Sequence, residues 1–270
     1  MICLAPSGQL PDMSIDLNIS DDGIALITIN RPERLNAMDA EHYQALSKAW
    51  ATVRDDPAIR VAIVTGAGER SFTTGADIKS FVTAPSGLSE MWLTQRDQLL
   101  NRGLEVWKPV VAAVNGYCLG GGMTLMMATD IRIAATHATF SLAEVKRGVI
   151  PGNGGTQRVL DQLPYAVGME MLLTGDGIDA VVAERWGLIN KIVPKEELLT
   201  TAYDYARRIA VNAPLAVQAA KELAVRSRDM DLTSGLRMEL VINRMLQFTE
   251  DAKEGPEAFT ARRKPNFKGK

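Results

Sequence analysis

The pattern of hydrophobic and polar positions divides the chain into an alternating αβ part and a helical part. Residues 14–19 and 23–29 alternate apolar and polar side chains on either side of a turn, which predicts a β-hairpin. Apolar side chains recur at helical spacing over 40–53, and the apolar run 61–65 predicts a buried strand. Strands that alternate with helices favour an α/β core whose ligand site lies at strand ends.

The middle of the chain is organised around a glycine turn. The apolar run 110–114 predicts a buried strand, three consecutive glycines follow at 120–122, and 123–128 predicts a helix. Such a turn leaves N–H groups unpaired at the helix start, and glycine lets a ligand approach them closely. The partial positive charge there suits an anion, or an oxygen on which negative charge develops. Taken alone, three glycines equally fit a tight turn packed against its neighbour.

Further elements complete the pattern. Strands are expected over 130–135, 139–142 and 189–193, helices over 85–105, 155–163, 166–173 and 178–186, and polar loops over 71–79 and 143–155. From 195 to 262 the sequence is helical and free of predicted strands, with expected breaks near 212–214, Asp229 and Gly255. This change predicts an α/β core over residues 1–195 and an all-helical region over residues 196–270.

Composition and charge narrow the classes of function. The net charge of the 270 residues is −2, so no basic field favours a nucleic-acid partner. Two cysteines, Cys3 and Cys118, are too few for a disulfide framework or a thiolate metal site. Two histidines, His42 and His137, leave little room for a metal centre or a Ser-His-Asp triad, and both are expected at the surface.

Several sequence features indicate the cellular location of the protein and whether it binds a nucleotide cofactor. No apolar run reaches membrane-spanning length, and residues 1–12 lack the features of a signal peptide, so we expect a cytoplasmic protein without a membrane partner. No Gly-x-Gly-x-x-Gly follows an early strand, and no Gly-Lys-Ser/Thr phosphate loop is present. A nicotinamide or ATP site is therefore not expected.

An ordered set of short motifs extends over nearly the whole chain. The motifs are Asn-Arg-Pro at 30–32, Gly-Ala-Asp-Ile-Lys at 75–79, the block 115–130, the segment 141–155, Leu-Thr-Gly at 173–175, and the tail from Phe259 to Phe267. In this order they resemble the crotonase superfamily, the enoyl-CoA hydratase/isomerase family. The resemblance implies an α/β spiral of ββα turns with a C-terminal helical trimerisation region. It also implies a homotrimer or homohexamer, an acyl-CoA thioester substrate, and no cofactor apart from the coenzyme A of that substrate.

The resemblance also implies where the substrate binds. It places an oxyanion hole at the backbone N–H groups of Ala76 and Gly121, because a thioester carbonyl that gains enolate character needs two fixed donors. Each such donor is worth about 3–4 kcal/mol in the transition state. The coenzyme A moiety would contact Arg34, Asp77, Ile78 and Lys79, and Lys264 and Phe267 would reach the ligand of a neighbouring subunit. A solvated basic terminus is the alternative for the tail.

One carboxylate of the family's usual pair is missing. Glu144 occupies the second position, but Thr124 stands three residues after Gly121, where hydratases of the family carry the first glutamate. A threonine hydroxyl can orient a water or bond the local backbone, but it is no base near neutral pH. Each positioned acid–base group contributes roughly 10²–10⁴-fold, so the loss of one is survivable. Asn153 can hold a water or a distal polar group of the substrate, or serve as a left-handed turn residue.

One glutamate beside an oxyanion hole fits three reactions. We adopt hydration of a 2-enoyl-CoA; double-bond isomerisation of a 3-enoyl-CoA, and hydration followed by retro-aldol cleavage of an aromatic enoyl-CoA, are the alternatives. Hydratase-lyases of the family also carry a small hydroxyl residue and a Pro-Gly-Asn loop, but they use a C-terminal tyrosine, and no tyrosine follows Tyr205. Outside the enzymes, a catalytically weak acyl-CoA-binding protein is the alternative.

Overall fold

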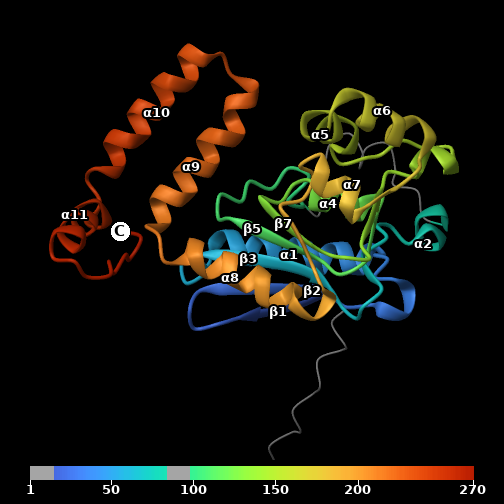
Figure 1. The fold of residues 1–270 in the computed structure, drawn as a ribbon, viewed down its shortest axis with the longest axis horizontal. Coiled ribbons are helices and arrows are strands. Elements are labelled where there is room, and N and C mark those ends of the chain that lie inside the picture. The colour runs from blue at the N-terminus through green and yellow to red at the C-terminus, as the bar shows by residue number, and fades with distance from the viewer. Residues whose placement is uncertain (1–14, 84–97) are drawn as a thin grey trace, which may run out of the picture.

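The chain folds into two β-sheets covered by helices, with a helical arm at its C-terminal end (Figure 1). This computed structural model describes residues 15–83 and 98–270. The larger sheet contains β1 (Ile15–Ile19), β2 (Ile24–Ile29), β3 (Val61–Gly66), β5 (Val110–Val114), β7 (Ile131–Ala135) and β10 (Lys191–Val193), in that order. The smaller sheet contains β4 (Ser71–Thr73), β6 (Tyr117–Leu119), β8 (Thr139–Ser141) and β9 (Ile178–Asp179).

Helices connect and cover the strands. They are α1 (Ala40–Asp55), α2 (Ile78–Thr83), α4 (Gly121–Met126), α5 (Gly155–Gln162), α6 (Tyr165–Thr174), α7 (Ala180–Arg185), α8 (Leu198–Ala210), α9 (Pro214–Arg226), α10 (Leu232–Leu246) and α11 (Glu250–Thr260). Short 3₁₀ turns lie at η1 (Pro32–Arg34), η2 (Glu144–Arg147), η3 (Lys195–Glu197) and η4 (Ser227–Asp229). Among the described residues, no helix combines the length and hydrophobicity needed to cross a membrane.

Successive pairs of strands divide between the two sheets. β3, β5 and β7 are parallel neighbours in the larger sheet, and the strand that follows each of them, β4, β6 or β8, joins the smaller sheet. β4, β6 and β8 are also parallel neighbours. Because neighbouring parallel strands end at the same edge of a sheet, the residues that follow these three strands are brought together.

The central strands of the larger sheet are buried on both faces. In β3, Ala62 and Val64 belong to the hydrophobic cluster that includes α1, whereas Val61 and Ile63 pack with α8. Helix α8 contributes the small side chain of Ala202 and its neighbours along the same face, which lets the helix lie close to the strands. Burial on two faces explains why these parallel strands are continuous apolar runs rather than alternating ones.

The C-terminal arm lacks a core of its own. Figure 1 shows α9, α10 and α11 reaching away from the two sheets. Neither α9 nor α10 contains a buried residue within the described chain, and α11 buries only Asp251 and Ala258. Large apolar side chains of the arm are exposed instead, including Leu232 at 77% and Phe248 at 87%.

Most predicted elements are confirmed, and the exceptions have physical reasons. The hairpin, the helix over 40–53 and the buried strands over 61–65 and 110–114 are present. The helix predicted over 85–105 lies outside the described residues up to residue 97, and for the remainder the prediction is wrong: residues 99–103 form a bridged turn. The short strands β4, β6 and β9 were not predicted, since three residues or fewer show no periodicity.

Two single-residue expectations are also wrong. Gly255 does not break a helix; it lies inside α11, where a Cβ would make only an ordinary contact, 3.7 Å from the Phe267 ring. His42 is not a surface residue: it is buried, and its Nδ1 contacts the helix-capping carboxylate of Asp39 at 2.6 Å. His137 is exposed, as expected.

Candidate active site

Three strand ends of the smaller sheet define the candidate site. β4 leads into Gly75 and Ala76, β6 leads into the glycine turn before α4, and β8 leads into Glu144. Residues that are widely separated in the sequence thus become neighbours through one sheet. Helix α4 begins after Gly120, whose backbone has φ +52° and ψ −118°, a combination that glycine adopts readily because it has no Cβ.

Two glycines allow the first two strand ends to touch. Gly75 has φ +82°, and a Cβ on it would lie 2.5 Å from the backbone N of Gly121. A Cβ on Gly121 would in turn lie 3.6 Å from the backbone N of Ala76. Any other residue type at position 75 would push the two segments apart. The amides of Ala76 and Gly121 can therefore lie next to each other only because residue 75 is a glycine.

The amides of Ala76 and Gly121 have no hydrogen-bond partner in the part of the chain that the structure describes. Met38 bridges the backbone around Ala76 by donating to Gly75 O and accepting from Asp77 N, both at 2.8 Å, and so bypasses the N–H of Ala76. Within residues 15–83 and 98–270, neither Ala76 N–H nor Gly121 N–H donates a hydrogen bond. Buried amides are nearly always paired, so two adjacent unpaired donors at a partly exposed position indicate a binding site for one oxygen.

The carboxylate of Glu144 lies against the same glycine turn. A Cβ on Gly120 would stand 3.2 Å from Glu144 Oε1, and Oε2 is buried without a hydrogen-bond partner in the described chain. Burial raises the pKa of Glu144, while its own backbone N–H and the charge of Arg147 act in the opposite direction. A carboxyl group with a raised pKa exchanges protons more readily near neutral pH than an exposed one.

Known proteins resemble this chain in sequence and in fold. The sequence matches the family described as Enoyl-CoA hydratase/isomerase over residues 20–270. The chain belongs to the enoyl-CoA hydratase/isomerase family. It is an enzyme of that family, and the predicted α/β crotonase fold is confirmed.

Relatives and solved structures match almost the full length. The chain is 44% identical to the (E)-benzylidenesuccinyl-CoA hydratase of Thauera aromatica, covering 95% of this chain and 100% of the relative. It is 40% identical to the carnitinyl-CoA dehydratase of Salmonella arizonae, with the same coverage. The crystal structure of an enoyl-CoA hydratase from Mycobacterium tuberculosis matches with a TM-score of 0.87 at 35% identity, covering 96% of this chain and 100% of that one.

Thr124, at the first glutamate position of the enoyl-CoA hydratase/isomerase family, is held inside the protein. It is 1% exposed, and its Oγ1 donates to Gly121 O at 3.0 Å. The same oxygen accepts from Asn101 Nδ2 at 3.1 Å. The local bond expected for a threonine near a helix start is therefore present, and the catalytic role of Thr124 stays a prediction.

The two segments expected to hold coenzyme A lie side by side. Arg31 donates to Asp77 Oδ2 at 3.1 Å and joins the loop after Asn30 to the loop after β4. Asp77 also accepts from Lys79 N at 3.1 Å, so its carboxylate already has structural partners. Arg34 and Lys79 are exposed, and Ile78 is 53% exposed.

Asn153 and the C-terminal tail differ in their relation to the site. Asn153 adopts φ +54°, as expected for a left-handed turn residue, and its carbonyl accepts from Arg158 at 2.8 Å. The Phe267 ring lies against Gly255 of α11. Figure 1 shows α11 and the C-terminal tail, which contains Lys264 and Phe267, at the opposite end of the molecule's long axis from α2. Within one chain they do not join Ala76 and Gly121, and their predicted contact with a neighbouring subunit's ligand stays a prediction.

Two residues near the site were not predicted from the sequence. Tyr43, on α1, places its hydroxyl 3.3 Å from where a Cβ on Gly121 would stand. Burial raises the pKa of Tyr43 to about 12, and the charge of Glu144 acts in the same direction. Asn101 lies in the segment 85–105, which was predicted to be a helix, and that prediction gave the residue no role in the site. Tyr43 occupied a core-facing position of a helix, and nothing in its spacing distinguishes a site phenol from a core one.

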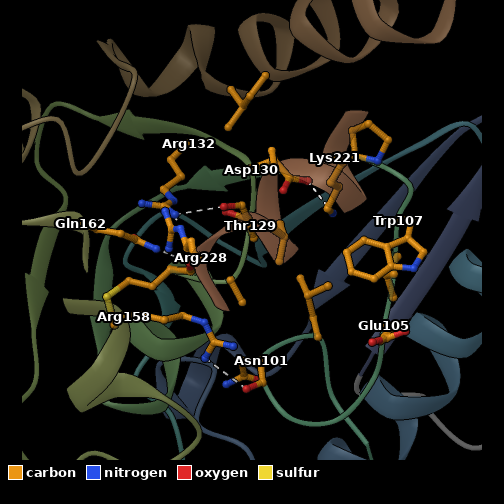
Figure 2. A pocket seen from close by; sticks show the side chains of 18 of the residues that line it. Asn101, Glu105, Trp107, Thr129, Asp130, Arg132, Arg158, Gln162, Lys221 and Arg228 are labelled. Atoms are coloured by element: carbon orange, nitrogen blue, oxygen red, sulfur yellow. Dashed lines mark hydrogen bonds and ion pairs between the residues drawn. The ribbon is translucent and has the colours of Figure 1, made fainter. Parts of the chain in front are cut away.

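A separate cavity of about 1000 Å³ lies between the core and α9 (Figure 2). Asn101, Arg132, Arg158 and Lys221 are among its lining residues, whereas the three strand-end residues of the candidate site are not. Among the described residues, no group of three or more histidine, cysteine or carboxylate side chains gathers as a metal site.

Proposed function

We propose that the protein hydrates a 2-enoyl-CoA to a 3-hydroxyacyl-CoA. The N–H groups of Ala76 and Gly121 bind the thioester oxygen and stabilise the negative charge that develops on it. Glu144 takes a proton from water as the water oxygen bonds to Cβ, and it returns a proton to Cα as the enolate collapses. The atoms balance, since one water is added and the carboxylate is regenerated.

The pair of unpaired amides beside a half-buried carboxylate carries this proposal. Removing one donor of this kind costs roughly 10²–10³-fold in turnover, which is about 2.7–4 kcal/mol. Glu144, whose pKa is raised by burial, lies against the same turn and supplies the proton transfer that the amides cannot. A single acid–base group of this kind contributes roughly 10²–10⁴-fold, so the site does not need the absent first glutamate to be active.

The names of two relatives support the substrate class. Both the (E)-benzylidenesuccinyl-CoA hydratase and the carnitinyl-CoA dehydratase are named for adding water to, or removing it from, a CoA thioester. Identities of 44% and 40% over nearly the whole chain support transfer of this reaction type rather than of either acyl group. The exposed Arg34 and Lys79 would hold the negatively charged coenzyme A moiety.

Double-bond isomerisation is the second candidate. One observation favours it: the hydroxyl of Thr124 is turned inward, so Glu144 handles protons without a second acidic partner at that position. A single carboxylate can carry a proton from Cα to Cγ of a 3-enoyl-CoA beside the same pair of amides. Aromatic hydratase-lyase chemistry has less support, because the sequence contains no tyrosine after Tyr205.

A product assay with the purified protein separates these reactions. Crotonyl-CoA, a 3-enoyl-CoA and feruloyl-CoA are offered separately, and the products are identified by mass and retention time. Hydration predicts a crotonyl-CoA product heavier by one water. An unchanged mass with a migrated double bond in the 3-enoyl-CoA reaction alone would favour isomerisation, and aldehyde release would favour the lyase. Binding without any product would contradict all three and support an acyl-CoA-binding protein.

A further inference from the structure

Thr124 makes three hydrogen bonds at the beginning of α4. Its backbone N–H donates to Gly120 O at 3.0 Å, and its hydroxyl donates to Gly121 O at 3.0 Å. The hydroxyl oxygen also accepts from the side-chain amide of Asn101 at 3.1 Å. With its proton already donated, and at 1% exposure, this hydroxyl has no proton to offer a bound water.

The bonds that Thr124 donates act on the two peptide groups on either side of Gly121, the residue that carries the second amide of the site. Gly120 O and Gly121 N–H belong to one planar peptide unit, so holding the oxygen also sets the direction of the N–H. The hydroxyl bond to Gly121 O holds the next peptide unit in the same way. Glycine residues have more backbone freedom than other residues. Hydrogen bonds from Thr124 therefore restrict the conformation of this turn more than they would restrict another sequence.

Asn101 is itself held on both sides. It is 5% exposed, and its backbone carbonyl accepts from Arg158 Nη1 at 3.2 Å (Figure 2). Arg158 also donates to Asn153 O at 2.8 Å, so one guanidinium ties the Asn101 turn to the loop before α5. The side-chain amide of Asn101 therefore reaches Thr124 from a fixed support, and it holds the hydroxyl in the rotamer that bonds Gly121 O.

We propose that Thr124 and Asn101 are positioning residues that aim the Gly121 N–H at the substrate's thioester oxygen. They do not replace the missing carboxylate, because both side chains are neutral and the hydroxyl proton is committed to Gly121 O. All proton transfer then falls to Glu144. The inference rests on the proposed function, since it requires a thioester oxygen bound at residues 76 and 121.

The test compares Thr124→Val with a matched control, Thr129→Val. Thr129 is also buried, and its hydroxyl likewise donates to a carbonyl three residues earlier, Met126 O at 2.7 Å, but beyond the far end of α4. Thr124→Val loses two hydrogen bonds of the hydroxyl, to Gly121 O and from Asn101 Nδ2, whereas Thr129→Val loses the bond to Met126 O, so Thr124→Val should lose more stability. Only the first should disturb the direction of the Gly121 N–H.

Two readouts distinguish positioning from stability. The first is the split of kcat and KM on the enoyl-CoA that the wild-type protein hydrates. The second is the ultraviolet absorbance band of the enolate form of bound acetoacetyl-CoA. This thioester forms more enolate when hydrogen-bond donors point directly at its oxygen. Thr124→Val should lower kcat about 10-fold with KM within about twofold, the effect of weakening one interaction by about 1.4 kcal/mol, and should weaken the band. Thr124→Ser should restore both, and Asn101→Ala should cause a smaller loss in the same direction.

The outcomes separate this inference from the proposed function. Wild-type kcat and a full enolate band in Thr124→Val, or equal losses in Thr129→Val, would overturn the positioning role. Asn101→Ala decides the question by the same two readouts if Thr124→Val does not fold, and a wild-type band there would also overturn it. A wild-type protein that neither hydrates an enoyl-CoA nor ionises acetoacetyl-CoA would instead contradict the proposed function.

Discussion

Glu144 is placed where its charge is unfavourable. Burial raises its pKa in the folded protein, so the folded state binds this proton more tightly than the unfolded state does. The stability that this group contributes is fully present below its unfolded pKa and is lost as pH rises through its folded pKa. At neutral and alkaline pH, the ionised carboxylate therefore opposes folding, which is a cost often found at catalytic groups.

Glu144→Gln should lower the turnover and raise the stability of the folded protein. Turnover should fall roughly 10²–10⁴-fold while acyl-CoA binding is kept, because the amide cannot transfer the proton. The variant should also unfold at higher urea concentration than wild type at pH 8, with a smaller difference at pH 5. Urea unfolding at both pH values and steady-state kinetics measure these effects.

Glu69 provides a control, because its pKa is shifted in the direction opposite to that of Glu144. Its side chain is exposed, and its hydrogen bond to Lys195 lowers its pKa, so this group adds stability above its unfolded pKa and loses it on acidification. Glu69→Gln should therefore lose a little stability at pH 8 and none of the turnover. A Glu144→Gln variant with wild-type turnover, or with no gain in stability at pH 8, would refute the role given to Glu144.

At the residue scale, the resemblance to a known family supplied the candidate groups. It predicted Ala76, Gly121 and Glu144, which lie at adjoining strand ends of the smaller sheet, and their roles stay predictions. Tyr43 and Asn101 were missed because their relation to the site depends on distances across the fold. A buried asparagine in a weakly patterned segment has no sequence property that points to a threonine 23 positions away.

At the element scale, the shortest strands matter most for the site. β4 and β6 have three residues each, and they are the strands that place Ala76 and Gly121. The long strands of the larger sheet were predictable because four or five apolar residues in a row are distinctive. Three-residue strands depend on neighbouring strands for their existence, so a local pattern cannot reveal them.

Gly75→Ala tests whether the close approach of β4 and β6 creates the site. The added Cβ would lie 2.5 Å from Gly121 N, and position 75 has φ +82°. Gly187→Ala is the matched control, because Gly187 has φ +74° but nothing within 4 Å of its Cβ position. Both should lose about 1–2 kcal/mol from the left-handed backbone.

Only the change at position 75 should also move the amides. We expect Gly75→Ala to lose at least tenfold in turnover beyond any loss in Gly187→Ala, as measured by steady-state kinetics alongside thermal unfolding. Equal turnover in the two variants would show that the contact between residues 75 and 121 does not matter for catalysis.

At the scale of the whole molecule, the arm points to self-association. Helices α9 and α10 contain no fully buried residue within the described chain, and single helices are marginally stable in water. Six large apolar side chains are exposed on α10 and directly after it, as is typical of a surface that contacts another protein. These side chains are Leu232, Leu236, Leu240, Val241, Met245 and Phe248. We propose that residues 196–270 mediate assembly of a homotrimer or homohexamer.

Leu236→Asp should weaken this assembly. Leu236 is 54% exposed on α10, and a carboxylate there would oppose burial against another copy. Light scattering should give three or six chains for wild type and fewer for the variant. Ile19→Asp, at a 44% exposed apolar residue of β1 outside the arm, should leave the mass unchanged. A monomeric wild-type protein would contradict the proposal.

The boundary near residue 195 can be predicted from the sequence pattern, but where the helices after it pack cannot. A change from mixed to helical sequence near residue 195 was visible, and the structure is helical from there on apart from its tail. The same pattern does not tell that α8 packs on the larger sheet while α9 and α10 leave it. Amphipathic helices need an apolar partner, and the sequence does not say whether that partner is the same chain or another one.

The central claim is that two main-chain amides hold one thioester oxygen while Glu144 moves the protons. The most direct test is a crystal structure of Glu144→Gln with the enoyl-CoA that the wild-type protein hydrates. We predict the thioester oxygen within about 2.7–3.1 Å of both Ala76 N and Gly121 N, with residue 144 facing Cα and Cβ. A thioester oxygen bound away from either amide would contradict the account.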